Sequence, residues 1–327
     1  MIQEGCLMEA YLGIDVGSVS TNVTVVDQQG KVSDTLYVRT QGRPIAAVQE
    51  GLREIERRNP GLKVRGVGAT GSGRQLTGVI VGADSVKNEI TAHAVAAMHL
   101  VPAVQTVLEI GGQDSKIIII RNHVVTDFAM NTVCAAGTGS FLDQQAARLN
   151  IAIEEFGRLA LESTAQVRIA GRCAVFAESD MIHKQQTGHS LADIINGLCQ
   201  SLVRNYLNNV GKGKQIMGPV LFQGGVAANK GMKRAFEEAL GCEVIVPQHY
   251  SVMGAVGAAL LAREETAGGK PTAFRGFAVI HSDYTPRSFE CSGCANMCEV
   301  IELKMDGVVI GCWGDRCGKW SGGVVVA

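Results

Sequence analysis

The chain repeats one succession of predicted elements, and this repeat restricts its fold more than any other feature. Alternating apolar residues predict strands at residues 11–16, 22–27 and 31–38, followed by a helix at 44–58. A second series begins at residue 106 with the strands TVLEIGG, SKIIIIRN and HVVTDFAM, which helical segments again follow. Two α/β units with the same order of elements predict two duplicated domains with a cleft between them.

The length of 327 residues is sufficient for two such domains. We expect the first α/β half to cover residues 1–100 and to be completed by a helix at 252–265. The second half is expected at 101–251. The composition changes after the second half's last helix, so we interpret residues 266–327 as a linker and a small cysteine-rich C-terminal tail.

Composition and charge exclude several classes of function. The net charge is −1 and aromatic residues make up 5%, so the sequence offers neither a basic field nor stacking platforms, and we expect no nucleic-acid partner. The apolar run KIIIIRN is too short to cross a bilayer, and the first residues lack the features of a secretion signal. We therefore expect no membrane association and a cytoplasmic location.

Three glycine-containing turns each follow a predicted strand: GIDVGSVSTN at 13–22, EIGGQDSK at 109–116 and FQGGVAANKGM at 222–232. Glycine lets the backbone approach a ligand closely, and N–H and hydroxyl groups in such turns bind phosphate oxygens. Asp15 ends its strand, where it can orient water on a magnesium ion. Gly224 and Gly225 can accommodate a flat ring against the backbone. A single turn of this kind is often structural, but three in this order favour a nucleotide site.

The three turns resemble the ATPase core shared by actin, heat-shock chaperones and sugar kinases. The resemblance implies that ATP or ADP and Mg²⁺ bind between the two domains. The expected catalytic residues are Asp15, Gln113 and Asp114. The expected nucleotide-binding residues are Gly13, Gly17, Ser18, Ser20, Thr21, Gly111, Gly112, Gly137, Gly224, Gly225, Val226 and Asn229. Glu109 opens the second turn where related ATPases often carry Asp, so its assignment to metal-bound water is weaker.

Two isolated cysteines, Cys134 and Cys173, each stand shortly before a predicted helix start. Two thiolates are too few for a four-cysteine metal site, and from these residues alone a buried core position is the alternative. The segments VCAAGTGSFLDQQA and RCAVFAESDMI, with EIGGQDSK and FQGGVAANKGM, resemble the activators of 2-hydroxyacyl-CoA dehydratases, or CoA-substrate-specific enzyme activases. These ATP-dependent reductase components also serve benzoyl-CoA reductases and double-cubane cluster proteins. The resemblance covers about residues 11–265.

The family resemblance implies a homodimer that holds one oxygen-labile 4Fe–4S cluster, with Cys134 and Cys173 of each subunit as ligands. It also implies that a ferredoxin or flavodoxin donates electrons. The acceptor would be a partner iron–sulfur dehydratase, reductase or double-cubane cluster protein. The predicted function is therefore low-potential electron transfer driven by ATP hydrolysis. Two alternatives remain: a small-molecule kinase of the same fold, and a chaperone-like binding ATPase with structural cysteines.

The tail contains five further cysteines in a dense pattern, C-x2-C-x3-C followed by C-x4-C. This density favours a zinc or iron–sulfur site with four of these residues as ligands, and a redox dithiol is the alternative. A disulfide staple is disfavoured in a reducing compartment. The candidate ligands are Cys291, Cys294, Cys298, Cys312 and Cys317. For Cys6, Cys199 and Cys242 we expect no metal ligation.

Overall fold

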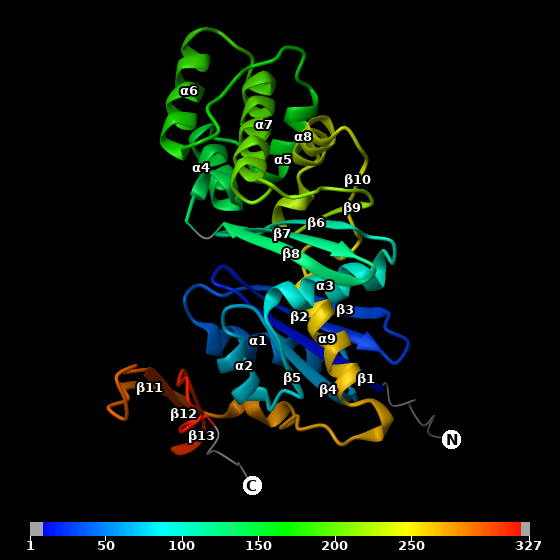
Figure 1. Cartoon of the computed structure of the whole chain (residues 1–327), viewed down its shortest axis with the longest axis vertical. Coiled ribbons are helices and arrows are strands. Elements are labelled where there is room, and N and C mark those ends of the chain that lie inside the picture. Colours follow the sequence, from blue (N-terminus) through cyan, green and yellow to red (C-terminus); the bar gives the residue numbers. More distant parts are fainter. Residues whose placement is uncertain (1–8, 132, 322–327) are drawn as a thin grey trace. The chain divides into compact units, whose positions relative to one another are not determined.

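The computed structural model describes residues 9–131 and 133–321, so Cys6 lies outside the described residues. The chain divides into two compact units. Unit 1 contains residues 1–92 and 254–327, and unit 2 contains residues 93–253. The duplicated α/β architecture that the sequence predicts is confirmed (Figure 1).

Unit 1 is built on a five-stranded sheet in the order β3-β2-β1-β4-β5. Its strands are β1 (Glu9–Val16), β2 (Ser20–Asp27), β3 (Val32–Arg39), β4 (Lys63–Thr70) and β5 (Ser85–Val86). Its helices are α1 (Pro44–Arg58), α2 (Arg74–Val81) and α9 (Met253–Glu265), and α3 (Glu89–Leu100) runs from unit 1 into unit 2. Helix α1 has Pro44 in its first turn and buries one face, which includes Val48, Leu52 and Ile55.

Helix α9 lies very close to the sheet of unit 1. A Cβ atom at Gly13 of β1 would overlap the backbone of Ala255, and one at Gly68 of β4 would overlap that of Ala258. On α9 itself, a Cβ atom at Gly257 would overlap the carbonyl oxygen of Ala92. Glycine is therefore required on both the sheet and the helix for this close packing.

Unit 2 repeats the same topology with the strand order β10-β9-β6-β7-β8. Its strands are β6 (Thr106–Ile110), β7 (Ser115–Arg121), β8 (Val124–Asn131), β9 (Val220–Gln223) and β10 (Val244–Ile245). Its helices are α4 (Gly139–Arg148), α5 (Ile153–Leu161), α6 (Ala174–Gln186), α7 (Leu191–Asn209) and α8 (Lys230–Leu240), with the short 3-10 helices η1 (Ala135–Gly137) and η2 (Gly225–Ala228). In both sheets the first strand pairs antiparallel with the next strand and parallel with a later one.

The cysteine-rich segment forms an antiparallel sheet that belongs to unit 1. After the 3-10 helices η3 (Ala267–Gly269) and η4 (Phe277–His281) come β11 (Tyr284–Glu290), β12 (Glu299–Met305) and β13 (Val308–Trp313). Leu303 and Ile310 are buried in the same core cluster as Leu52 and Ile80 of unit 1. The segment is thus packed on unit 1, although its sequence reads as a separate tail.

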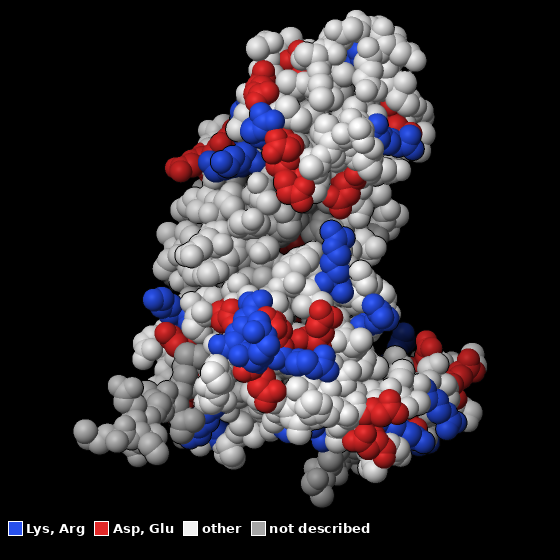
Figure 2. All heavy atoms as spheres, turned by 180° about the vertical axis from the view of Figure 1, so that it is seen from behind, with Lys and Arg blue, Asp and Glu red and all other residues white. Residues whose placement is uncertain are grey.

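Acidic and basic side chains are interspersed on the face drawn in Figure 2. On α1, Glu54 forms ion pairs with both Arg57 and Arg58. In the described part of the chain, no helix combines the length and the apolar character needed to cross a membrane.

Candidate functional site

The first glycine-containing turn connects β1 and β2. It is closed by a hydrogen bond from the Gly17 N–H to the Ser20 carbonyl oxygen (2.8 Å). Thr40 Oγ1 donates to the Gly17 carbonyl oxygen (2.9 Å) and thereby fixes the turn from outside it. Ser18 is exposed and Ser20 is half-buried, so both can contact a ligand. Thr21 is fully buried and bonds Thr40 (3.0 Å), so the structure places it beneath the turn as a support.

Three oxygen-bearing side chains share one face at the end of this sheet. In the strand register, Asp15 of β1 lies opposite Asn22 of β2 and opposite Thr70 of β4. Cross-strand neighbours point to the same side of a sheet. Asn22 Oδ1 and Thr70 Oγ1 are buried and have no hydrogen-bond partner among the described residues. Carboxylate, amide and hydroxyl oxygens are the donors that Mg²⁺ prefers, so this set fits a hydrated magnesium ion.

Two glycines enclose the Asp15 carboxylate. A Cβ atom at Gly71 would overlap Asp15 Oδ1, and one at Gly254 would overlap Asp15 Oδ2. Gly71 also has a φ of 85°, which side-chain-bearing residues rarely adopt. The conformation of Asp15 therefore depends on the absence of side chains at these two positions.

Unit 2 has the same arrangement with different side chains. Glu109 of β6 lies opposite Lys116 of β7 and opposite Gln223 of β9. Lys116 Nζ is 3.0 Å from Glu109 Oε2 and 2.9 Å from Asp114 Oδ2. Lys116 and Glu109 are both almost fully buried. The carboxylate that corresponds to Asp15 is therefore neutralised by a lysine of the same chain, which weakens further the assignment of Glu109 to metal-bound water.

The second turn is joined to the segment that carries Cys134. The Gly111 N–H donates to the Asp114 carbonyl oxygen (3.0 Å) and closes the turn. The Gly139 and Ser140 N–H groups, at the start of α4, donate to the carbonyl oxygens of Gly111 and Gly112 (2.9 Å each). The turn and the first residues of α4 are thus one hydrogen-bonded piece.

The two predicted catalytic side chains of this turn differ in their surroundings. Asp114 is half-buried and held by its ion pair with Lys116. Gln113 is exposed, and its side chain makes no hydrogen bond with any described residue. Gln113 is therefore the side chain of the turn that is able to reorient.

The third turn leaves β9 at Gly224, whose φ of 88° again favours glycine. The Gly224 N–H donates to the Tyr250 carbonyl oxygen (2.8 Å), while Gly225 has open space around its Cα. Val226 is part of the hydrophobic core of unit 2. Asn229 caps α8 by accepting from the Met232 N–H (3.1 Å), and its buried Nδ2 has no partner among the described residues. Of the predicted binding residues in this turn, Gly225 is the exposed one.

Two other predicted binding residues are enclosed by protein atoms. Gly13 packs against α9, as described above. A Cβ atom at Gly137 would lie 2.6 Å from Asn205 Oδ1 and 3.0 Å from Asn131 Nδ2. Both glycines allow close packing within their own unit.

A buried histidine, His93, is hydrogen-bonded to the last residue of β9. Gln223 Nε2 and His93 Nδ1 are 2.7 Å apart. Burial, with a smaller contribution from the charge of Lys116, lowers the pKa of His93 to about 3. His93 is therefore neutral in the folded protein throughout the physiological range.

This lowered pKa predicts a loss of stability in acid. An unfolded histidine binds a proton below about pH 6.5, whereas folded His93 does not do so until about pH 3. Unfolding is therefore favoured as the pH falls through 6.5, by up to about 1.4 kcal/mol per pH unit between about pH 6 and pH 4. Urea unfolding should show a steeper loss between pH 7.5 and pH 5 for the wild type than for His93→Gln. Equal losses in the two proteins would contradict the prediction.

The thiols of Cys134 and Cys173 are both half-buried. Cys173 is the N-cap residue of α6, and Cys134 is the N-cap residue of η1, which leads into α4. The prediction that each precedes a helix is thus confirmed. Neither cysteine side chain makes a capping hydrogen bond at its helix start.

The structure brings these two cysteine segments together. Cys134 Sγ lies 3.9 Å from the carbonyl oxygen of Arg172, the residue before Cys173. Asn205 Nδ2 lies 3.6 Å from Cys134 Sγ and 2.6 Å from the Gly171 carbonyl oxygen, so it joins both segments. Two cysteines on adjoining segments of each chain fit half of a four-thiolate cluster.

The remaining cysteines are placed differently. Cys199 is fully buried, and burial raises its thiol pKa to about 12, which makes it unreactive. Cys242 is exposed. No group of three or more His, Cys, Asp and Glu side chains in residues 9–131 and 133–321 is positioned to hold a metal ion, and this includes the five cysteines of the C-terminal segment.

Three of those five cysteines, Cys291, Cys294 and Cys298, lie in the loop between β11 and β12. The Cys291 N–H donates to the Cys298 carbonyl oxygen (2.8 Å) and closes the loop that contains Cys294. Trp320 Nε1 donates to Cys291 Sγ (3.4 Å), which brings the segment after Cys317 to the same place. Cys312 lies within β13 opposite Glu302. Cys312 thus belongs to a strand, whereas Cys291, Cys294 and Cys298 belong to the loop.

Sequence reasoning missed Asn22, Thr70, Lys116, His93 and Asn205. Each acts through a partner from a different strand or helix, and strand register is not visible in a single sequence. Only Lys116 carried a signal: a lysine within the strand SKIIII has to find a counter-charge if the strand is buried.

Comparison with known proteins identifies the family. The family model described as the BadF/BadG/BcrA/BcrD ATPase family matches residues 12–262. The (R)-2-hydroxyglutaryl-CoA dehydratase activating ATPase of Acidaminococcus fermentans is 37% identical over 78% of this chain and 98% of its own length. A benzoyl-CoA reductase subunit from Thauera aromatica is 29% identical over 77% of this chain and 93% of its own length.

Solved structures agree with this result. The crystal structure of the A. fermentans dehydratase component A aligns with a TM-score of 0.72 at 35% identity, over 79% of this chain and 99% of that one. The activator of the 2-hydroxyisocaproyl-CoA dehydratase from Clostridium difficile with bound ADPNP gives a TM-score of 0.71 at 30% identity, over 79% and 95% of the two chains. The actin-like fold predicted from the sequence is thus confirmed, and the chain belongs to the BadF/BadG/BcrA/BcrD ATPase family.

Proposed function

We propose that this ATPase is a reductive activator, which passes electrons at low potential from a 4Fe–4S cluster to a partner iron–sulfur enzyme. The relatives include ATPases that activate CoA dehydratases and a component of benzoyl-CoA reductase. In the proposal, a homodimer holds the cluster through Cys134 and Cys173 of both subunits. A ferredoxin or flavodoxin supplies the electrons.

One observation carries the proposal: the second turn is bonded to the start of α4, shortly after Cys134. Any movement of Gly111 and Gly112 on nucleotide binding is transmitted through the Gly139 and Ser140 N–H groups to the thiol segment. These connections between the turn and α4 are backbone hydrogen bonds, and all of their residues lie in unit 2. A switch of this kind changes the angle of a helix at the cluster and so couples nucleotide state to redox state.

The residues of the two turns have distinct roles in this proposal. Bound nucleotide supplies the phosphoryl group, Mg²⁺ neutralises its charge, and the cluster carries the electron. Asp15 would hold a hydrated magnesium ion, while the turns of Gly17 and of Gly111 would each let backbone N–H groups approach phosphate oxygens. Lys116 fixes Asp114, and Gln113 orients the water that attacks the γ-phosphate, in a reaction where positioning dominates.

Anaerobic purification tests the proposed function. We expect a brown protein with about four iron atoms per dimer and a broad visible absorption that oxygen bleaches. Bound ATP should increase the rate at which an iron chelator removes the cluster, because the thiol segment moves. A colourless protein that binds ATP and carries no iron would favour the kinase or the chaperone-like ATPase.

We also propose that the C-terminal segment binds zinc or a second iron centre, through Cys291, Cys294, Cys298 and Cys317. These residues surround one loop end, whereas Cys312 is held within β13. A metal ion bound by these thiolates would stabilise the fold of the segment.

The full chain allows this second site to be tested separately. We expect the Cys291→Ser/Cys298→Ser variant to lose about one metal ion, or one cluster, per chain relative to the wild type. Cys312→Ser should keep the full amount. Elemental analysis of zinc and iron decides the matter. If the double variant and Cys312→Ser contain equal metal, the segment is not a metal site and the dithiol alternative gains support.

A further inference from the structure

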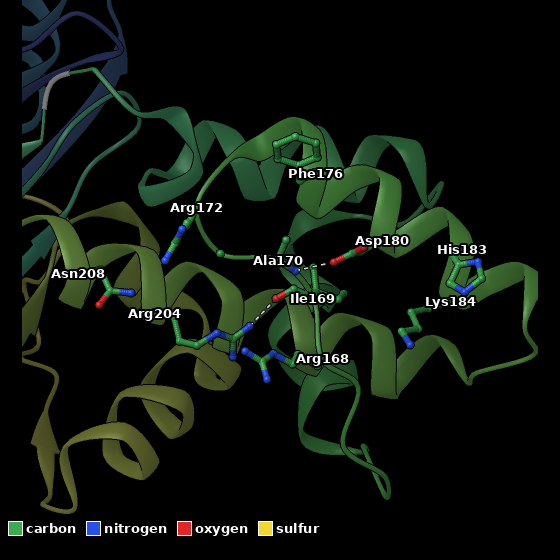
Figure 3. Close-up of a pocket in the computed structure, with 11 residues that line it drawn as sticks. Arg168, Ile169, Ala170, Arg172, Phe176, Asp180, His183, Lys184, Arg204 and Asn208 are labelled. Carbon is green, nitrogen blue, oxygen red and sulfur yellow. Dashed lines mark hydrogen bonds between the residues drawn. The ribbon is translucent and has the colours of Figure 1, made fainter.

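Unit 2 has a groove that the nucleotide and thiol sites do not use. It is lined by residues of α6, α7 and the segment before α6, and its volume is about 730 Å³. Its charged side chains are Arg168, Arg172, Asp180, Lys184 and Arg204, with His183 at one end (Figure 3). A second cavity of about 510 Å³ shares Gly171, Arg172 and Asn208 with it and adds Lys212. The two cavities form one basic surface.

These cations have few partners of their own. The side chains of Arg168, Arg172, Lys184 and Lys212 form no hydrogen bond or ion pair with any residue that the structure describes. Arg204 donates to the Ile169 carbonyl oxygen, and Asp180 Oδ2 accepts from the Ala170 N–H (2.8 Å), as the dashed lines in Figure 3 show. The one acidic side chain of the groove is therefore turned toward the backbone.

The positive charges of the arginines in the groove repel one another. Burial lowers the pKa of Arg204, and the charge of Arg168 lowers it further. Figure 3 shows the guanidinium groups of these two residues side by side, with Arg172 nearby. Like charges gathered in one groove are unfavourable, and an anionic ligand would relieve this repulsion.

The groove adjoins the thiol segment. Its wall at residues 169–171 is held by α7, where Ser201 Oγ donates to the Ala170 carbonyl oxygen and Asn205 Nδ2 to that of Gly171. Arg172 lines both cavities and precedes Cys173 directly. Beside it, Val175 and Phe176 are 67% and 65% exposed. Cations next to exposed apolar side chains are typical of a surface that docks a protein.

We infer that this groove docks an acidic surface segment of the small electron-donor protein, beside Cys134 and Cys173. The inference rests on the proposed function and adds to it where the donor binds. A flavodoxin or ferredoxin supplies the carboxylates that the groove's cations lack. The exposed side chains of Val175 and Phe176 favour a protein over a small phosphate ligand. Opposite charges would also accelerate the encounter of the two proteins.

The test uses a purified flavodoxin as the donor and a charge reversal in the groove. Arg168→Glu/Lys184→Glu alters two side chains that have no partners in the described structure, so the fold should persist. The control is Lys31→Glu/Lys87→Glu, which changes the net charge equally at two exposed residues of unit 1. Binding to immobilised flavodoxin is measured at low and moderate salt. We expect the groove variant to bind at least tenfold more weakly, with a smaller salt dependence, and the control to bind like the wild type.

Equal affinity of the groove variant and the control for flavodoxin would overturn the inference, and so would an absence of flavodoxin binding by the wild type. A third outcome would also overturn it: the wild type binds pyrophosphate with micromolar affinity, and the groove variant loses this binding but keeps its flavodoxin binding. The last would assign the groove to a small phosphate ligand. Iron content is measured on the same preparations. Full iron with unimpaired binding by the groove variant rejects only the docking site. Absence of iron rejects the proposed function, whatever the binding data show.

Discussion

Replacing Cys134 with serine is expected to abolish the iron bound between subunits and to convert the dimer into monomers. Each protomer contributes two thiolates in the proposal, so one substitution per chain leaves two of the four ligands. Cys134 and Cys173 lie on adjacent segments, which Asn205 joins, so the loss of either should have the same effect. Iron analysis and light scattering under anaerobic conditions measure the two consequences.

The matched control is Cys242→Ser, because Cys242 is exposed and lies outside the thiol pair. It should keep both the iron and the dimer. Each substitution is made in the Cys291→Ser/Cys298→Ser background. Iron bound by the C-terminal segment then does not contribute to the iron content that is compared. An oxygen-labile cluster that survives in the Cys134→Ser/Cys173→Ser variant would show that other residues ligate it.

Gly254→Ala is expected to weaken the binding of Mg²⁺–ATP by at least about a hundredfold, or about 2.8 kcal/mol. The added methyl group would overlap the Asp15 carboxylate, and α9 cannot retreat, because Gly257 of the same helix is already in close contact with the backbone of Ala92. The carboxylate must therefore leave the face that it shares with Asn22 and Thr70. Calorimetric titration with ATP, with and without magnesium, measures the loss.

Two further variants make this test decisive. Gly218→Ala introduces the same methyl group where no atom lies within 4 Å, and should bind ATP normally. Asp15→Asn keeps the shape of the side chain but removes its charge, and should lose the magnesium dependence even if Gly254→Ala proves unstable. The role of Asp15 would be refuted if a folded Gly254→Ala protein and the Asp15→Asn variant both bound Mg²⁺–ATP with wild-type affinity.

Local patterns predicted much of this fold. Alternation in YLGIDV and NVTVVD located β1 and β2, and the spacing of Ile45, Val48, Leu52 and Ile55 located α1. The repeat of this order near residue 106 predicted the second unit. The helix starts after Cys134 and Cys173 were also predictable, because small residues follow each cysteine and a helical pattern follows them.

Contacts between distant segments were not predictable in this way. The neighbours of Asp15 depend on which strands pair and in what register, so Asn22 and Thr70 carried no signal. The packing of Gly13 against α9 and the hydrogen bond between Thr21 and Thr40 were likewise not visible in the sequence. The placement of β11–β13 on unit 1 follows from apolar side chains that only the folded core reveals as partners.

Lys116 has a consequence for how the protein responds to its surroundings. A dissociable counterion can be diluted, exchanged or removed by a chelator, and its occupancy follows its concentration. The ammonium group beside Glu109 and Asp114 is attached to the chain by covalent bonds, so its local concentration is the same in every medium. The second turn should therefore keep its shape in EDTA and across a wide range of ionic strength. Unit 2 thus carries the counter-charge of its second turn within its own chain.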